Sequence, residues 1–458
     1  MWWQVLPLCP IGQGDSPYDS YSSVGANPLL ISPDSLIEDG LLVRSDVHHH
    51  GFPDHEVHFS AVRQFKTAML DRAWRNFSNG AAGHLRDEFD AFVTDHASQL
   101  DEYALFMAIK EQFGGAKWFQ WPAELALRNP GALAQARQEL TNRVRQECFS
   151  QFLAVRQWDQ LKRHANQRGL RIIGDLPIFV SVDSVDVWAY PEQFLLDERH
   201  RPTFVAGVPP DYFSTTGQLW GNPLYAWERM SGDGYAWWTR RLRNVLRYFD
   251  LVRLDHFRGL HAAWHIPAGS STAVTGRWVP GPGADFLNHV RSTFGGLPMI
   301  AEDLGQITLD VLALRQQFDM PGMRVLQFAF DGNPDNWFLP HNYDPNTVVY
   351  TGTHDNDTTL GWFRLLHDVD RHRVLAYTRT DGRDIVWDLI RLAWSSVARV
   401  AIVPAQDLLQ LDSHARMNRP GVAAGNWRWR MRPDQSPQHA IADLRNLTEY
   451  FNRLPRGS

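Results

Sequence analysis

Short apolar runs alternate along the chain with longer segments whose apolar residues recur every three or four positions. The runs are rich in Val, Ile and Leu and contain few polar residues, a pattern typical of parallel strands that are buried on both faces. They cover Trp3–Leu6, Arg171–Asp175, Leu251–Asp255, Met299–Glu302, Val325–Phe330, Thr347–Thr351 and Val400–Val403. Strands that alternate with helices in this way predict a parallel α/β fold.

The longest helical pattern lies between the first and second of these strands. Val62, Phe65, Met69 and Ala73 fall on one helical face, and the same spacing continues to about Gln167. We therefore expect a helical insertion subdomain over residues 57–167. The remaining residues, 1–56 and 168–458, are then expected to form one catalytic domain.

Polar residues stand where several of the predicted strands stop. Functional side chains at the carboxyl ends of parallel strands are typical of a (β/α)8 TIM barrel, whose active site lies at that end. Seven strands are predicted, whereas a complete barrel has eight. The fold expected from the pattern is therefore an α/β TIM barrel with a helical insertion and with one strand unaccounted for.

Composition and charge exclude several classes of partner. The net charge of −6 comes from interspersed basic and acidic residues, which does not favour nucleic-acid binding. No apolar run reaches membrane-spanning length, and two isolated cysteines predict unpaired thiols in a cytoplasmic protein. The 19 Trp residues suit either an aromatic core or the flat apolar faces of sugars, and composition alone favours neither.

The stretch DLVRLDHFRG places charges inside an apolar strand. Residues two apart in a strand point to the same side, so Arg253 and Asp255 share one face while Val252 and Leu254 share the other. A nearby guanidinium lowers the pKa of an aspartate and keeps it ionised, which suits a nucleophile. A purely structural ion pair is the alternative interpretation.

Two further strands end in carboxylates. Glu302 follows PMIA, and His354 and Asp355 follow VVYTGT. Three carboxylates at three strand ends predict a catalytic site at the mouth of a barrel. Asp303 and Asp357 are instead expected to be loop residues or helix N-caps.

Together these motifs resemble the signature of the 4-α-glucanotransferase family of the α-amylase clan, which comprises the amylomaltases or disproportionating enzymes. The similarity rests on LVRLDHFRG, IAEDLG and TGTHDNDT, and continues through WWQVLPL, GDSPYDSYS, RIIGDLPIFV, VAGVPPDYFS, GQLWGNPLY, PGMRVLQFAF, FLPHNY and GNWRWRM. It covers nearly the whole chain. In that family an N-terminal strand and helix precede the WWQVLPL strand, so the resemblance implies that the first β/α unit is missing here and explains the count of seven.

The resemblance implies a role for each matching residue. It places the nucleophile at Asp255, the general acid/base at Glu302 and the transition-state stabiliser at Asp355. Residues implied to contact the sugar or to line the glucan-binding cleft are Arg253, His354, Tyr18, Asp211, Gln218, Trp220 and Asn426. Asp175 is implied either to support the site or to be structural.

The implied reaction is a retaining double displacement that moves α-1,4-linked glucan segments between maltooligosaccharides. Transfer requires that a bound acceptor outcompete water, and we expect the Gly- and Pro-rich stretch 267–282 to be a covering loop or a plain surface loop. No cofactor or metal is implied, since adjacent histidines at His48–His50 do not converge on one ion. An α-glucan hydrolase and a non-catalytic glucan-binding remnant are the alternatives.

Overall fold

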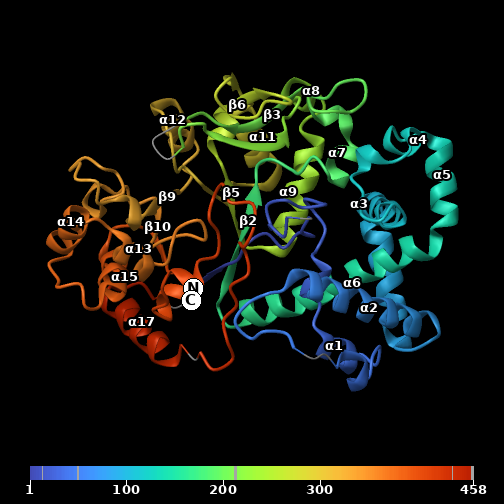
Figure 1. The fold of residues 1–458 in the computed structure, drawn as a ribbon, viewed down its shortest axis with the longest axis horizontal. Coiled ribbons are helices and arrows are strands. Elements are labelled where there is room, and N and C mark those ends of the chain that lie inside the picture. Colours follow the sequence, from blue (N-terminus) through green and yellow to red (C-terminus); the bar gives the residue numbers. More distant parts are fainter. Residues whose placement is uncertain (13, 49–50, 211–213, 436, 455–458) are drawn as a thin grey trace. The chain divides into compact units, whose positions relative to one another are not determined.

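The fold is that of a computed structural model, which describes residues 1–458 except 13, 49–50, 211–213, 436 and 455–458 (Figure 1). The described residues form two compact units. The N-terminal unit comprises Trp2–Gly51 and Phe59–Pro298, and the C-terminal unit comprises Met1, Phe52–His58 and Met299–Ser458. Within the described residues, no helix is long and apolar enough to cross a membrane.

Three parallel strands of the N-terminal unit run in the order β1 (Trp2–Gln4), β2 (Arg171–Pro177) and β5 (Leu251–Asp255). The register pairs Trp3 with Ile172 and Asp175 with Arg253. Ile172 and Val252 are fully buried, in agreement with the apolar runs that predicted these strands. The register also brings an acidic and a basic residue side by side on neighbouring strands.

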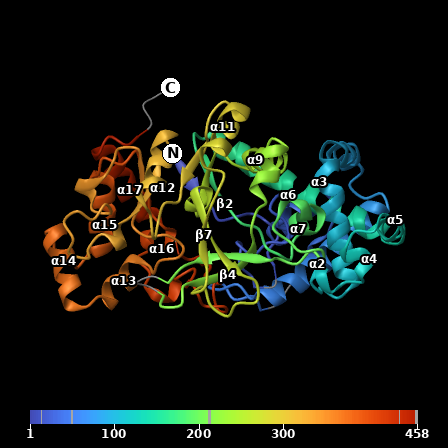
Figure 2. The ribbon, with the colours of Figure 1, turned by 90° about the horizontal axis from the view of Figure 1, so that it is seen from above.

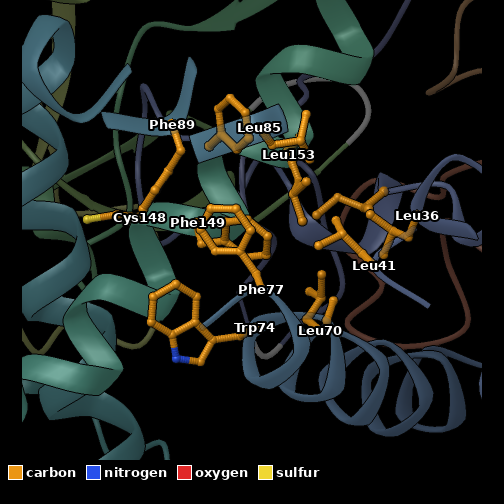
Figure 3. Packing of buried hydrophobic residues seen from close by; sticks show 14 of the residues in the cluster. Leu36, Leu41, Leu70, Trp74, Phe77, Leu85, Phe89, Cys148, Phe149 and Leu153 are labelled. Carbon is orange, nitrogen blue, oxygen red and sulfur yellow. The ribbon is translucent and has the colours of Figure 1, made fainter. Parts of the chain in front are cut away.

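Residues 59–167 are mainly helical, and Figures 1 and 2 show α3, α4 and α5 together on one side of this unit. Trp74 and Phe77 of α2 pack against Phe89 of α3 and Phe149 of α6, and the Phe77 and Phe149 rings stack 4.5 Å apart (Figure 3). Such aromatic packing accounts for the helical spacing of apolar residues in this part of the sequence. The expected division into a subdomain over 57–167 and a catalytic domain stays a prediction.

The helices of the N-terminal unit have the following bounds: α1 Pro33–Glu38, α2 Phe59–Ser78, α3 Arg86–Gln112, α4 Ala123–Ala126, α5 Pro130–Glu139, α6 Thr141–Gln167, α7 Val185–Ala189, α8 Trp227–Gly232, α9 Ala236–Tyr248, α10 Arg258–His261 and α11 Gly283–Phe294. Single-turn 3₁₀ helices occur at Pro28–Leu30, Arg44–Val47, Gly83–Leu85, Trp118–Gln120 and Pro191–Gln193.

A second sheet of the N-terminal unit is antiparallel and was not predicted. Its order is β4 (Gln218–Pro223), β3 (Phe204–Val208), β6 (Ala262–Pro267) and β7 (Arg277–Pro280). The interpretation of 267–282 as a loop throughout is wrong, because β7 lies inside it and pairs with β6. The Gly and Pro residues around RWVP hid a short strand whose backbone hydrogen bonds are supplied by its neighbour.

Four parallel strands of the C-terminal unit run in the order β8 (Met299–Ala301), β9 (Gly322–Val325), β10 (Thr347–Tyr350) and β11 (Val400–Ile402). The strand predicted at Val325–Phe330 is misplaced. Arg324, which stands inside the true strand, interrupts the apolar run in the sequence, whereas the apolar residues after it form a 3₁₀ helix at Leu326–Phe328. Burial of a charged residue in the strand therefore displaced the prediction.

The remaining helices of the C-terminal unit have the following bounds: α12 Leu309–Gln317, α13 Thr359–Leu365, α14 Asp368–Thr378, α15 Ile385–Ser395, α16 Ala405–Leu408 and α17 Gln438–Tyr450, with 3₁₀ turns at Leu326–Phe328, Pro340–Asn342 and Ser413–Ala415. Figure 2 shows α14, α15 and α17 grouped together. Leu389 and Ile390 of α15 are fully buried in a core that includes Leu326 and Val349. That core supports the strands from which the site residues of this unit extend.

Candidate functional site

The strand β5 carries its charged residues on the face opposite its apolar residues, as predicted. Val252 and Leu254 are at most 1% exposed. On the other face, the Arg253 side chain is 4% exposed and the Asp255 side chain is 29% exposed. Asp255 is thus the last residue of a buried strand, with a carboxylate that reaches solvent.

Arg253 joins two carboxylates. Its Nη1 donates to both oxygens of Asp175, at 2.9 and 2.8 Å, and its Nη2 lies 2.9 Å from Asp255 Oδ1. The Tyr18 hydroxyl donates to Asp175 Oδ2 at 2.6 Å. We call these four residues the Arg253 cluster. The Asp175 side chain is 1% exposed, so Arg253 balances its buried charge and Tyr18 supplies a further hydrogen bond in place of water.

The residue after the nucleophile candidate is a partly buried histidine. His256 has a left-handed backbone with φ of 55°. Desolvation and the nearby Arg258 lower the pKa of His256 to about 4, so it is uncharged at neutral pH. Its ring lies edge-on to Trp220, with centroids 4.8 Å apart. This contact brings one predicted glucan-binding residue close to the end of β5.

Trp220 and Gln218 extend from β4, and the Trp220 Nε1 donates to Gln218 Oε1 at 3.1 Å. Trp220 is 38% exposed, unlike Trp118, Trp188 and Trp238, which are fully buried. The chain therefore uses Trp both in its core and on an accessible surface. Asp211, the other predicted binding residue of this region, lies outside the described residues.

Glu302 follows β8 and is 8% exposed, and its Oε1 accepts a hydrogen bond from the Leu304 backbone at 2.8 Å. Asp303 lies in the loop after β8, one of the two places expected for it, but its burial was not predicted. Asp303 is fully buried, lies 3.3 and 3.4 Å from Arg315 and Arg324, and accepts the Met323 amide at 2.7 Å. Burial raises the pKa of Asp303 despite the two guanidinium groups.

Asp355 follows β10 and has a side chain that is 44% exposed. Asn418 Nδ2 donates to Asp355 Oδ1 at 2.6 Å, and Arg416 Nη2 donates to the Asp355 backbone oxygen at 2.7 Å. His354 Nε2 lies 3.5 Å from Asp355 Oδ2. We call these four residues the Asp355 cluster.

Asn426 belongs to the same C-terminal loop as Asn418. Its Oδ1 accepts the Arg419 amide at 3.0 Å, and its Nδ2 donates to the Val422 carbonyl at 2.8 Å. The adjacent Trp427 lies with its ring centroid 5.8 Å from that of His354. In this structure Asn426 shapes its loop, and its contact with glucan stays a prediction.

The structure assembles the predicted residues into two sets. Tyr18, Arg253 and Asp255 meet in the N-terminal unit, and His354 and Asp355 meet in the C-terminal unit, which also holds Glu302. Asn418 and Arg416 were missed by the sequence analysis, although both are polar residues a few positions before GNWRWRM. Across the described part of the chain, no group of three or more His, Cys, Asp or Glu is placed to hold a metal ion.

Comparison with known proteins gives the following matches. Residues 1–436 match a family model described as 4-alpha-glucanotransferase. A 4-alpha-glucanotransferase of Thermus thermophilus is 49% identical over 99% of this chain and 92% of its own length. One of Synechocystis sp. is 48% identical over 98% of this chain and 90% of its own length.

A solved structure is similar as well. The amylomaltase from Streptococcus agalactiae, determined in complex with acarbose, superposes with a TM-score of 0.95 at 36% identity, over 98% of this chain and 92% of that one. A second amylomaltase, from Corynebacterium glutamicum, has a TM-score of 0.76 at 17% identity, which shows similarity of fold. The α/β architecture expected from the sequence is thereby confirmed.

Proposed function

The chain belongs to the 4-alpha-glucanotransferase family and transfers α-1,4-glucan segments, and we propose that it does so by retaining double displacement with Asp255 as nucleophile. The observation that carries the proposal is the 2.9 Å contact of Asp255 with Arg253 at the end of β5. The guanidinium favours the ionised carboxylate that must attack carbon. Maltooligosaccharides serve as both donor and acceptor.

In the first half-reaction, an Asp255 oxygen attacks C1 of the donor sugar. The glycosidic C1–O bond breaks, and Glu302 donates its proton to the departing 4-oxygen. The product is a β-linked glycosyl ester on Asp255. In the second half-reaction, Glu302 removes the proton from the 4-hydroxyl of an acceptor glucan, whose oxygen displaces the ester and restores an α-1,4 bond.

Asp355 stabilises the positive charge that develops on the sugar ring in both transition states. A retaining mechanism places the nucleophile and acid/base carboxyls about 5 to 5.5 Å apart, against roughly 6.5 to 9.5 Å in inverting enzymes. That spacing is a prediction for Asp255 and Glu302.

Azide rescue tests the two roles in one experiment. With α-maltosyl fluoride as donor, Asp255→Gly leaves room for azide to attack C1 directly, which yields β-maltosyl azide. With Glu302→Ala, the ester on Asp255 still forms, because fluoride needs little protonation, and azide then displaces the ester to give α-maltosyl azide. The same azide anomer from both variants would overturn the assignment.

Maltotriose distinguishes transfer from hydrolysis. The wild-type enzyme should convert it into a ladder of shorter and longer α-1,4-glucans, because a bound acceptor outcompetes water for the ester. Formation of glucose and maltose alone would instead indicate a hydrolase.

A further inference from the structure

The C-terminal loop holds Asp355 at three points. The Asn418 amide side chain donates to Asp355 Oδ1 at 2.6 Å. The Asn418 backbone amide donates to the His354 carbonyl at 3.0 Å, and Arg416 donates to the Asp355 carbonyl at 2.7 Å. Residues more than sixty positions away in sequence therefore donate hydrogen bonds to the His354 and Asp355 carbonyls and to one oxygen of the Asp355 carboxylate.

The loop is itself braced. Arg416 Nε donates to the Asn418 carbonyl at 2.8 Å, and the Trp427 amide donates to the Met417 carbonyl at 2.7 Å. Within the same unit, the Val57 amide donates to the Arg428 carbonyl at 2.7 Å. The Asn418 side chain is thus presented from a loop whose backbone is fixed on both sides.

The hydrogen bond from Asn418 has a directional consequence. With Oδ1 engaged by Asn418, Asp355 Oδ2 is the oxygen on the side of His354, 3.5 Å from Nε2. Because the side chain is 44% exposed, packing does little to fix its rotamer. The amide donor supplies the constraint that burial does not.

We propose that Asn418 is a positioning residue for glucan transfer, which orients the Asp355 carboxylate toward the reacting sugar by donating one hydrogen bond to it. The proposal rests on the proposed role of Asp355 as transition-state stabiliser. Asn418 is neutral, so it fixes the carboxylate without neutralising the charge that must face the oxocarbenium-like sugar. An arginine in its place would fix the carboxylate but weaken that field.

Two substitutions separate donation from loop shape. Asn418→Ala removes the donor and should lower kcat about 10²-fold with little change in KM, because misplacement of a catalytic group chiefly affects the transition state. Asn418→Asp keeps the side-chain shape and both backbone hydrogen bonds, yet at neutral pH it presents a second carboxylate to Asp355. It should lower kcat at least as far as Asn418→Ala.

Acidic pH should restore part of the activity of Asn418→Asp. As the pH falls, the two adjacent carboxylates share a proton, and the introduced group donates an O–H to Asp355 in place of the lost N–H. The activity of Asn418→Asp, relative to wild type at each pH, should therefore rise toward acidic pH, while that of Asn418→Ala stays level. The other charged or titratable groups near this pair are His354, Asp357, Arg416 and Arg419.

A matched control lies at the opposite end of β10. Asn346 also donates its side-chain amide to two oxygens, those of Asp319 at 3.0 and 2.9 Å. Asn346→Ala removes side-chain amide hydrogen bonds to an aspartate that has no proposed part in the reaction, and should leave kcat and its pH profile as in wild type. Thermal unfolding of all variants shows whether each is folded under assay conditions.

The outcomes are distinguishable. Loss of kcat in both Asn418 variants, with acid rescue of Asn418→Asp alone, supports positioning by donation. Full activity of Asn418→Asp at neutral pH, or equal pH profiles for both variants, would overturn it. If Asp355→Asn retains near-normal turnover, the proposed role of Asp355 is wrong. If Asp355→Asn is inactive but both Asn418 variants are fully active, only the proposed role of Asn418 is wrong.

Discussion

The Arg253 cluster and the Asp355 cluster hold their carboxylates by opposite means. In the first, the buried guanidinium of Arg253 bridges two aspartates. Asp255 lies on the same strand as Arg253, and Asp175 lies on the strand paired with it. In the second, a half-exposed carboxylate is held by a neutral amide from a distant loop. The buried charges of the Arg253 cluster therefore affect mainly the stability of the fold, whereas the amide of Asn418 affects mainly the orientation of the Asp355 carboxylate.

The largest expected effect is on the nucleophile. Asp255→Asn should lower transfer by about four orders of magnitude or more, because the amide cannot form the glycosyl ester. The free energy of unfolding should change by less than about 1 kcal/mol, since Arg253 keeps its two hydrogen bonds to Asp175. Turnover of maltotriose and chemical denaturation measure the two quantities. Unfolding of the variant would instead favour the structural ion pair.

The second expected effect is on stability. Arg253→Met leaves Asp175 as an uncompensated carboxylate that is 1% exposed, and should cost about 3–5 kcal/mol of unfolding free energy. The double variant with Asp175→Asn serves as control, because it removes the buried charge as well and should recover part of the loss. If Arg253→Met alone were as stable as wild type, the Arg253 cluster would not stabilise the fold by charge pairing, and the stated difference between the two clusters would be wrong.

A smaller effect is expected at Tyr18. Tyr18→Phe removes the 2.6 Å hydrogen bond to Asp175 but leaves both bonds from Arg253, and should cost about 1.5 kcal/mol of unfolding free energy. In the Arg253→Met background the same substitution should cost more, since Tyr18 is then a principal donor to a buried carboxylate. A double-mutant cycle measures this coupling.

The last effect concerns the pH dependence of stability and does not alter stability at neutral pH through proton binding. The pKa of His256 is lowered to about 4, so between about pH 6.5 and 4 the unfolded chain binds a proton at this residue and the folded chain does not. Stability from this group is present above that window and is lost as the pH falls through it. His256→Gln should reduce the slope by up to about 1.4 kcal/mol per pH unit.

A second histidine serves as comparison for that slope. Desolvation and Arg277 lower the pKa of His265 to about 4 as well. His265→Gln should reduce the slope in the same window and the double variant should reduce it further. An unchanged slope in His256→Gln would show that this side chain does not titrate as the structure implies.

Sequence alone predicted the features that depend on neighbours in the chain. The two-residue period of a strand placed Arg253 and Asp255 on one face, and the apolar runs located six of the seven parallel strands in the described part of the chain. The family resemblance supplied the roles of residues such as Glu302, which no local pattern assigns. The helical spacing of residues 59–167 likewise reflects a core that the structure contains.

The features that were missed depend on long-range partners. The sequence marks Asn418 as an ordinary loop residue, and only the fold brings it to Asp355. Asp303 is a loop residue as expected, but its burial between Arg315 and Arg324 is visible only in the structure. Arg324 concealed β9 because a buried charge is tolerated only with a partner that the local sequence does not reveal. The β6–β7 pairing was hidden by the Gly and Pro residues around RWVP.

The most direct test of the account is to identify the residue that becomes glycosylated. Glu302→Gln enzyme mixed with α-maltosyl fluoride should accumulate the ester, because fluoride departs without strong acid assistance while the missing base slows attack by the acceptor. Digestion and mass spectrometry should find one maltosyl group on the peptide that contains Asp255. A label on any other residue, or steady turnover without a covalent intermediate, would contradict the claim that Asp255 is the nucleophile.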